Sequence, residues 1–325
     1  MKTKIVNYYI VRKIINAVRN YKVYKTYYSV HNKIPETVKK SCVIYCADGH
    51  IKHGGLADRL YGILTTYALC KIKNIRFYIY YVYPYDLSLF LVPGSYDWRI
   101  SEKEITYNSR YAVPKSVMGG CRKITKNAIK IRGVRQIHFY SNFKYLETIN
   151  NIFKTDFTYK QLFDELFTFS QFFMKDFSFY QKKLPEKYTS LQIRIQNALN
   201  DFDDVGCITL GQTEQENLIH VCNQKIKSVY EKYHVLILLT SDSEKLLNRM
   251  KEMDKGFGRI VTIPGEIIHT DTVSDSSYEL NKKTFIDFFL LAEGQPVCQI
   301  KDPYIYVSGF SIMGAHIRGK ECVFI

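Results

Sequence analysis

The chain has 325 residues, of which 46% are hydrophobic and 24% are charged, which is the composition of a globular protein. It contains no run of 18 apolar residues, so its composition excludes a membrane-spanning helix. Because the length exceeds the size of one ordinary hydrophobic core, we expect two domains.

The balance of charge is strongly basic, with 46 Lys and Arg against 31 Asp and Glu and a net charge of +15. Such a charge favours anionic partners, namely nucleic acid, acidic lipid headgroups or phosphorylated substrates. A basic nucleic-acid-binding protein is therefore one hypothesis. Against it, Lys and Arg are not interleaved with aromatic residues, and no nucleic-acid-binding motif is present.

The first 40 residues form a basic amphipathic segment, with ten Lys and Arg against the single acid Glu36. Ile10, Ile14, Val18 and Tyr21 recur at helical spacing. Two interpretations remain open: the helix rests on an anionic membrane surface, or it packs its apolar stripe against the rest of the fold.

The eight cysteines are scattered through apolar patterns, and no secretory signal is present, so we expect buried reduced thiols and a cytoplasmic protein. Cys42 and Cys46 lack a second pair at zinc-finger spacing. His50 and His53 could bind a metal with help from Asp48, but no fourth ligand is evident. We therefore predict no metal site.

A βα unit opens the globular part of the chain. Residues 42–46 read as a buried strand, residues 60–73 have helical periodicity, and residues 75–82 read as a second buried strand. Gly54 and Gly55 then lie in the turn between strand and helix, where backbone can approach an anionic ligand. Asp58 and Arg59 follow in the first helical turn, and since Arg is disfavoured there, Arg59 is expected to serve a partner.

Residues 84–133 have little periodicity and predict loops, short helices and acceptor-binding elements. Residues 158–180 are rich in Phe and compatible with a core helix. From residue 188 strands alternate with helices again. The expected strands are 189–195, 235–239, 259–263 and 297–300, and the expected helices are 213–233, 243–253, 284–292 and 310–317. This alternation predicts a second parallel α/β sheet, and two such domains would bind ligands at the carboxyl ends of their strands.

Polar side chains follow three of these strands. Arg194 lies in an otherwise apolar strand, where either a phosphate or one of the nearby Asp201, Asp203 and Asp204 would balance its charge. The segment Thr240-Ser241-Asp242-Ser243 offers a helix cap and a carboxylate for a ribose hydroxyl or a base N–H. The third segment is Ser308-Gly309-Phe310-Ser311, whose hydroxyl and N–H groups could hold a pyrophosphate.

The order of these motifs along the chain resembles that of the GDP-fucose-dependent fucosyltransferases. The motifs are Gly-Gly-Leu-Ala-Asp-Arg-Leu at 54–60, Arg194, the 240–243 segment, Asp287 with Leu290-Leu291-Ala292, and the 308–311 segment. The likeness is greatest to the bacterial α1,6 enzymes related to nodulation-factor synthesis, and more distant to protein O-fucosyltransferases. It covers roughly residues 41–82 and 188–322. The chain departs from the family pattern at Gln192, where a His is common, and at Gln196-Asn197, where Gly-Asp is common.

The resemblance implies two Rossmann-like domains facing a cleft, of the GT-B glycosyltransferase type, with an acceptor domain over 41–184 and a nucleotide-sugar domain over 185–325. It implies an inverting, metal-independent transfer of fucose from GDP-fucose to a glycan hydroxyl, in bacterial surface polysaccharide or glycoprotein glycan synthesis, with no cofactor. A transferase that uses another nucleotide sugar is the alternative enzyme. The protein would be cytoplasmic, with possible peripheral contact at the inner membrane face through residues 1–40.

The resemblance also assigns roles to residues. Arg194 contacts the β-phosphate and stabilises the departing GDP. Asp201 is the first choice for the catalytic base, and Asp58 is the second. Nucleotide-sugar contacts are expected from Gly54, Gly55, Arg59, Arg194, Thr240, Ser241, Asp242, Ser308, Phe310 and Ser311.

Overall fold

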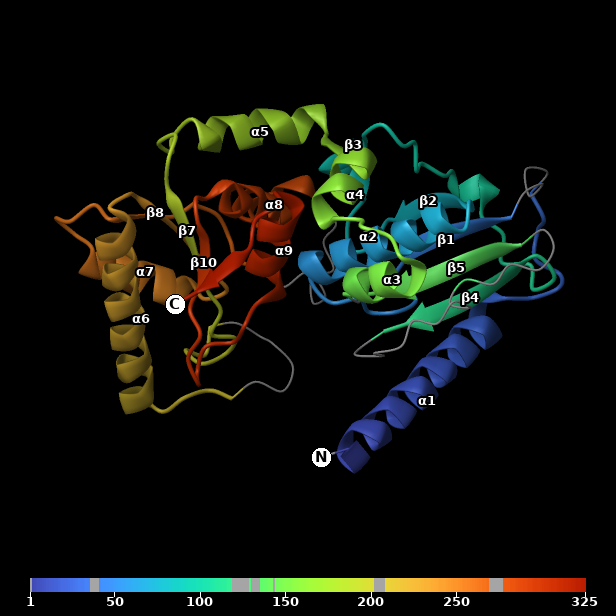
Figure 1. The fold of residues 1–325 in the computed structure, drawn as a ribbon, viewed down its shortest axis with the longest axis horizontal. Helices are drawn as coiled ribbons and strands as arrows, with labels where there is room; N and C mark the ends of the chain where they lie inside the picture. Colours follow the sequence, from blue (N-terminus) through green and yellow to red (C-terminus); the bar gives the residue numbers. More distant parts are fainter. Residues whose placement is uncertain are drawn as a thin grey trace. The chain divides into compact units, whose positions relative to one another are not determined.

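The computed structural model describes residues 2–35, 41–118, 129, 135–142, 144–201, 208–268 and 277–325. The chain divides into two units, Met1–Thr168 and Phe169–Ile325, which are drawn in blue to green and in yellow to red in Figure 1. Each unit has its own sheet.

The first unit is built on a four-stranded parallel sheet. Its strands are β1 (Cys42–Ala47), β2 (Arg76–Tyr81), β4 (Ala112–Val117) and β5 (Gln136–Ser141), in the order β2-β1-β5-β4. All six residues of β1 are buried, which is expected of a parallel strand covered on both faces. The strands expected at 42–46 and 75–82 are confirmed, whereas β4 and β5 were not predicted.

Helix α2 (Leu56–Ile72) follows β1 and packs on this sheet. Gly62 permits the close approach, because a Cβ at this position would lie 1.9 Å from the carbonyl oxygen of Ser141 in β5. Helices α3 (Leu146–Phe153) and α4 (Tyr159–Leu166) pack in turn on α2. The short helices η1 (Leu87–Leu89) and η2 (Glu102–Glu104) occupy the aperiodic region as expected, whereas the strands β3 (Leu91–Pro93) and β4 in the same region were not predicted.

Helix α1 (Lys2–Tyr27) packs on β4 through a polar face. Asn16 donates to the carbonyl oxygen of Met118 at 3.0 Å and accepts from the Ser116 hydroxyl at 2.9 Å. On the opposite side, Ile14, Val18 and Tyr21 are exposed by 57%, 46% and 63%. The described part of the predicted stripe therefore does not pack on the fold, and Ile10 lies among the side chains outside the description. Among the described residues, no helix is both long and apolar enough to cross a membrane.

The second unit has a five-stranded parallel sheet in the order β11-β10-β7-β8-β9. Its strands are β7 (Thr189–Ile193), β8 (Ile237–Ser241), β9 (Ile260–Val261), β10 (Val297–Gln299) and β11 (Cys322–Phe324). Helices α6 (Gln212–Tyr233) and α7 (Glu244–Met253) cover one face, and α8 (Tyr278–Glu293) and α9 (Gly309–Ile317) cover the other (Figure 1). The expected strands and helices are confirmed, and among the described strands of this sheet β11 was not predicted.

The Phe-rich region predicted as one helix is divided into α4, the short strand β6 (Phe167–Phe169) and α5 (Gln171–Gln181). Thr158 and Ser170 cap the two helices, and each accepts from a backbone N–H of the first turn. Helix α5 packs on α8, and the Tyr278 hydroxyl donates to Asp176 at 2.7 Å.

The protein is thus a mixed α/β protein with parallel sheets, as the sequence predicts. Helix α5 belongs to the second unit, whereas the sequence predicted that residues up to 184 belong to the first domain. Six cysteines (42, 46, 70, 222, 298 and 322) carry no disulfide in the described residues, and Cys121 and Cys207 lie outside them.

Candidate functional site

The carboxyl ends of β7 and β8 bring Arg194 and Asp242 together in the second unit. Ile193 and Ser241, the last residues of the two strands, are paired in register, so the residues that follow them are neighbours. The Nε atom of Arg194 lies 3.5 Å from Oδ2 of Asp242. A parallel sheet commonly binds its ligand at this edge.

Asp242 holds the chain where it leaves β7. Its two carboxylate oxygens accept from the backbone N–H groups of Ile195 and Gln196, both at 2.9 Å. Gln196 has a φ of 54°, in the left-handed region, so the carboxylate stabilises a turn that the backbone alone disfavours. Burial raises the pKa of Asp242 to about 6, although the Ile195 N–H and the Arg194 charge oppose this increase.

Arg194 is partly accessible, with 26% of its side chain exposed. Its guanidinium lies 5.0 Å from the ring centroid of Tyr306, and the N–H of Tyr306 donates to the Arg194 carbonyl at 2.7 Å. Tyr306 follows β10 in the loop before α9, and the sequence analysis missed it. Asp242, 48 positions along the chain, is a charged partner of Arg194 that the sequence did not suggest, and the pairing with a phosphate or with one of the nearby Asp residues stays a prediction. Asp203 and Asp204 lie outside the described residues.

The start of α9 is held to the sheet by two buried glutamines. Gln299 of β10 accepts from the N–H of Ser308 at 2.9 Å, and Gln192 of β7 accepts from the N–H of Ser311 at 3.0 Å. The Ser308 hydroxyl caps the helix by accepting from the N–H of Phe310 at 3.2 Å. These backbone donors already have acceptors, so the expected phosphate contacts of the 308–311 segment stay a prediction. The role of both glutamines could have been suspected from the sequence, because each places an amide side chain inside a strand that is expected to be buried.

The 240–243 segment forms a turn and a helix cap. The Ser241 hydroxyl accepts from the N–H of Ser243 at 3.1 Å, and the Ser243 hydroxyl accepts from the N–H of Leu246 at 3.0 Å, which confirms a serine cap on α7. The Thr240 hydroxyl is buried and has no hydrogen-bond partner within the described residues. Thr240 thus carries the hydroxyl of the segment that neither the turn nor the helix cap uses.

Asp201 contacts the N-terminus of the same helix, α7, although it lies outside the 240–243 segment. Its Oδ2 accepts from the Ser243 hydroxyl and from the N–H of Lys245, both at 2.8 Å. A carboxylate at a helix N-terminus is stabilised by the N–H groups and by the dipole. In this structure Asp201 therefore has a structural role, and its assignment as catalytic base stays a prediction.

In the first unit, the predicted βα turn is present between β1 and α2. Gly54 has a φ of +88°, and a Cβ there would lie 2.4 Å from Oδ2 of Asp58, whereas Gly55 caps α2 in an extended conformation. Arg59 is only 1% exposed and donates to the carbonyls of Gly54 at 3.0 Å and Tyr83 at 2.9 Å. Arg59 therefore braces this turn, and the nucleotide-sugar contacts expected from Gly54, Gly55 and Arg59 stay predictions.

The histidines of the turn do not form a metal cluster. His50 pairs through Nδ1 with Oδ2 of Asp48 at 3.0 Å, and Nδ1 of His53 lies 2.8 Å from the carbonyl oxygen of Ile51. Over the described part of the chain, no group of three or more His, Cys, Asp or Glu could hold a metal ion.

Neither a protein-family model nor a curated protein matches this chain. Among solved structures, NodZ alpha-1,6-fucosyltransferase soaked with GDP-fucose is similar with a TM-score of 0.52 and 11% identity, over 86% of this chain and 93% of that chain. Fucosyltransferase NodZ from Bradyrhizobium gives a TM-score of 0.51 at 11% identity, over 85% and 92% of the two chains. POFUT1 in complex with GDP-fucose aligns over 90% of this chain at a TM-score of 0.42. The NodZ similarity confirms, at the level of the fold, the resemblance to GDP-fucose-dependent fucosyltransferases that the sequence motifs suggest.

Proposed function

We propose that this protein is an inverting glycosyltransferase that moves fucose from GDP-fucose to a hydroxyl of a glycan. The observation that carries the proposal is the position of Arg194, partly accessible at the carboxyl end of the central strand β7, in a fold similar to that of NodZ. NodZ has been crystallised with GDP-fucose and with GDP, which supports the choice of donor. We further propose the GT-B arrangement, with donor binding by residues 185–325 and acceptor binding by residues 41–184.

In this mechanism Arg194 stabilises the departing GDP. Cleavage of the bond between the sugar and the β-phosphate leaves negative charge on the phosphate oxygens, and a positioned guanidinium can donate to two of them. Asp242 positions Arg194 by fixing the turn after β7. After the hydrogen bonds from the two backbone N–H groups, the Asp242 oxygens still have free lone pairs. This carboxylate can therefore also accept a hydrogen bond from the nucleoside, as the resemblance implies.

The remaining nucleotide contacts in the proposal come from the ends of β8 and β10. Thr240 supplies a buried hydroxyl without a partner in the described residues. Ser308, Phe310 and Ser311 contact the phosphates only if the bonds of their N–H groups to the glutamines are exchanged for bonds to the ligand. Ser241 contributes by shaping the turn that carries Asp242.

Substitution of Arg194 tests the proposal. Arg194→Ala is expected to lower the rate of transfer about 10²- to 10³-fold, the usual effect of losing one transition-state donor. Arg249→Ala is the matched control, since Arg249 is an exposed arginine of α7 in the same unit. Transfer is measured as GDP release from GDP-fucose with a glycan mixture. Near-normal turnover of Arg194→Ala would exclude Arg194 from the chemistry.

A thermal-shift screen tests the donor independently of the acceptor. Stabilisation by GDP and GDP-fucose, but not by UDP or CMP, is expected, and the shift should be the same with and without EDTA if the reaction needs no metal. Stabilisation by UDP would show that the donor is a UDP-sugar and not GDP-fucose. Binding of arbitrary RNA that weakens steeply with salt, without any response to GDP, would instead favour a nucleic-acid-binding protein.

Helix α1 provides the surface for the proposed membrane contact. Its exposed apolar side chains lie beside Lys22 and Lys25, and such a helix binds anionic lipid by apolar insertion and charge attraction. The full-length protein should sediment with vesicles of phosphatidylcholine and phosphatidylglycerol, and less with phosphatidylcholine alone. Ile14→Glu should reduce this binding, whereas Ser228→Glu on exposed α6 should reduce it much less. Equal binding of both variants would argue against α1 as the contact and against a peripheral location at the inner face of a membrane.

A further inference from the structure

A pocket of about 470 Å³ lies entirely within the first unit, beside the carboxyl end of β1. Its lining combines aromatic rings with charged and amide groups, including Tyr27, Lys33, Asp48, His50, Glu102 and Tyr107. The volume is in the range of small-ligand sites. None of the sites discussed above uses this pocket.

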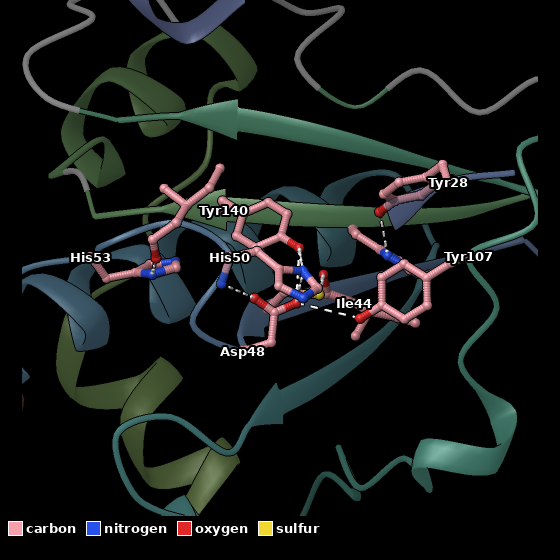
Figure 2. Close-up of polar contacts among 10 residues, drawn as sticks. Tyr28, Ile44, Asp48, His50, His53, Tyr107 and Tyr140 are labelled. Carbon is pink, nitrogen blue, oxygen red and sulfur yellow. Dashed lines mark hydrogen bonds and ion pairs between the residues drawn. The ribbon is translucent and has the colours of Figure 1, made fainter. Parts of the chain in front are cut away.

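Asp48 and His50 both line the pocket, and Figure 2 shows how the two side chains lie side by side. Oδ2 of Asp48 lies 3.0 Å from Nδ1 of His50 and accepts from the Tyr140 hydroxyl at 2.9 Å, and Oδ1 accepts from the N–H of His50 at 3.0 Å. Although burial opposes it, the bonds from His50 and Tyr140 hold the pKa of Asp48 below its ordinary value. An ionised carboxylate at Nδ1 favours the tautomer with the proton on Nδ1.

That tautomer leaves Nε2 of His50 as a proton acceptor. Within the described residues Nε2 has no hydrogen-bond partner, and 17% of the side chain is exposed. The Tyr27 ring stacks on the imidazole at 3.6 Å between centroids, with the planes 16° apart. A carboxylate that orients an imidazole, with the far nitrogen open to a ligand, is the arrangement that a general base requires.

Hydrogen bonds from the side-chain amides of Asn32 and Asn108 hold together the segments that contribute Tyr27 and Tyr107 to the lining. Asn32 donates to the carbonyls of Tyr27 and Tyr107, at 2.8 and 3.0 Å, and Asn108 donates to the carbonyls of Val30 and Asn32, both at 2.8 Å. These bonds join the end of α1 to the loop after η2. The pocket is therefore preorganised, with tyrosine faces for the apolar face of a sugar ring and with polar groups for its hydroxyls.

We propose that this pocket binds a glycan and that His50 accepts the proton of the hydroxyl that attacks the donor. This inference rests on the proposed function for the identity of the donor. The hydroxyl proton passes to Nε2, the oxygen forms a bond to C1 of the fucosyl group, and the bond from C1 to the β-phosphate breaks with its electron pair leaving on GDP. The imidazolium that results is paired with Asp48, a positioning residue. In this mechanism His50 replaces Asp201 and Asp58 as the base.

The binding step is tested with the full-length protein on an array of defined oligosaccharides. Val82 lines the pocket and is exposed, so Val82→Trp should fill the pocket and abolish glycan retention. Val11→Trp, at an exposed valine of α1 outside the lining, is the matched control and should retain glycans. Absence of any retained glycan, or equal retention by the two variants, overturns the pocket assignment. Glycan retention without a thermal shift from GDP would support the pocket and refute the donor.

The base is tested with a retained glycan and GDP-fucose. His50→Gln should lower kcat at least about 10²-fold, as expected for a general base, while the KM for the glycan changes little. His31→Gln, at an exposed histidine outside the pocket, should behave as wild type. Loss of kcat in Asp201→Asn or Asp58→Asn, with His50→Gln still active, overturns the assignment.

The role of Asp48 has a readout that does not need turnover. Nitrogen-15 NMR should show the proton of neutral His50 on Nδ1 in the wild type. In Asp48→Asn the side-chain amide can donate to Nδ1 and move the proton to Nε2, which removes the acceptor. The same tautomer in both proteins would refute the positioning role.

Discussion

The buried carboxylate of Asp242 should make the second unit less stable as the pH rises from about 4 to about 6. Its pKa of about 6 in the folded protein stands above the ordinary value of 3.8. In this window the unfolded chain has released the proton while the folded chain still binds it. Stability therefore falls with increasing pH until the folded group is also ionised. The difference of about two pH units corresponds to about 3 kcal/mol.

Asp242→Asn isolates this contribution, because asparagine has a similar shape and does not titrate. One oxygen can still accept from the N–H of Ile195 or Gln196, but the amide NH₂ leaves the other N–H without its acceptor, at a cost of about 1–3 kcal/mol. That loss is independent of pH. The difference in stability between wild type and variant should therefore change by about 2 kcal/mol between pH 4 and pH 7, always in the direction that favours the variant at higher pH, because part of the full difference of about 3 kcal/mol lies below pH 4.

Hydrogen exchange of the β7 and β8 amides, corrected for intrinsic rates at each pH, measures the unit that contains Asp242. The single tryptophan, Trp98, is buried in the first unit, so its fluorescence reports the urea unfolding of that unit. As an internal control, this unfolding curve should be the same for wild type and Asp242→Asn at each pH. A pH-independent difference between wild type and variant would refute the argument. A wild type that gains stability on this interval would also refute it, because that is the behaviour of a carboxylate with a lowered pKa.

Three further outcomes follow from the contacts described above. Gly54→Ala should destabilise the first unit in urea unfolding by at least about 1–2 kcal/mol, because its φ is +88° and the new Cβ meets a carboxylate. Gly55→Ala, with open space and an ordinary φ, should cost less, since it only replaces a favoured N-cap residue of α2 by a poorer one. Ser243→Ala should cost about 1 kcal/mol in the unfolding of the second unit through loss of the α7 cap, compared with little for Ser228→Ala on exposed α6. Because the pKa of Asp48 is lowered, its stabilising contribution should be present at neutral pH and be lost below about pH 4, and Asp48→Asn should flatten this acid limb in a pH series of urea unfolding.

The order of elements in both units could be predicted because each element carries its own periodicity. The strands β1, β7 and β8 are buried at every residue, and the helices between them bury one face or are buried all round. The strands that were missed lack this signal. β11 has three residues, none of them fully buried, and β4 contains a proline and a lysine, which are uncommon inside strands. Their pairing is set by neighbours in the sheet rather than by their own composition.

Residue roles at the site were harder to predict because they depend on partners far along the chain. The sequence placed Arg59 in a turn suited to a ligand, but nothing local shows that the carbonyl of Tyr83 would reach its guanidinium. It placed Asp201 after the Arg194 strand, but not against the first turn of α7. Arg59 and Asp201 were thus predicted near the correct strand ends, but in the structure both of them form hydrogen bonds with backbone groups.

The two buried carboxylates at strand ends show what sequence alone lacks. Asp48 follows β1 and Asp242 follows β8, each directly after an apolar strand, yet their pKa values are displaced in opposite directions. Asp48 receives donors from His50, two residues away, and from Tyr140, 92 residues away, and these outweigh its burial. Asp242 is bound mainly to backbone N–H groups 46 and 47 residues earlier, and its burial prevails. For Asp48 the sign of the shift is set mainly by His50, two residues along the chain, with support from the distant Tyr140. For Asp242 it is set by burial, which depends on tertiary packing that no local motif encodes.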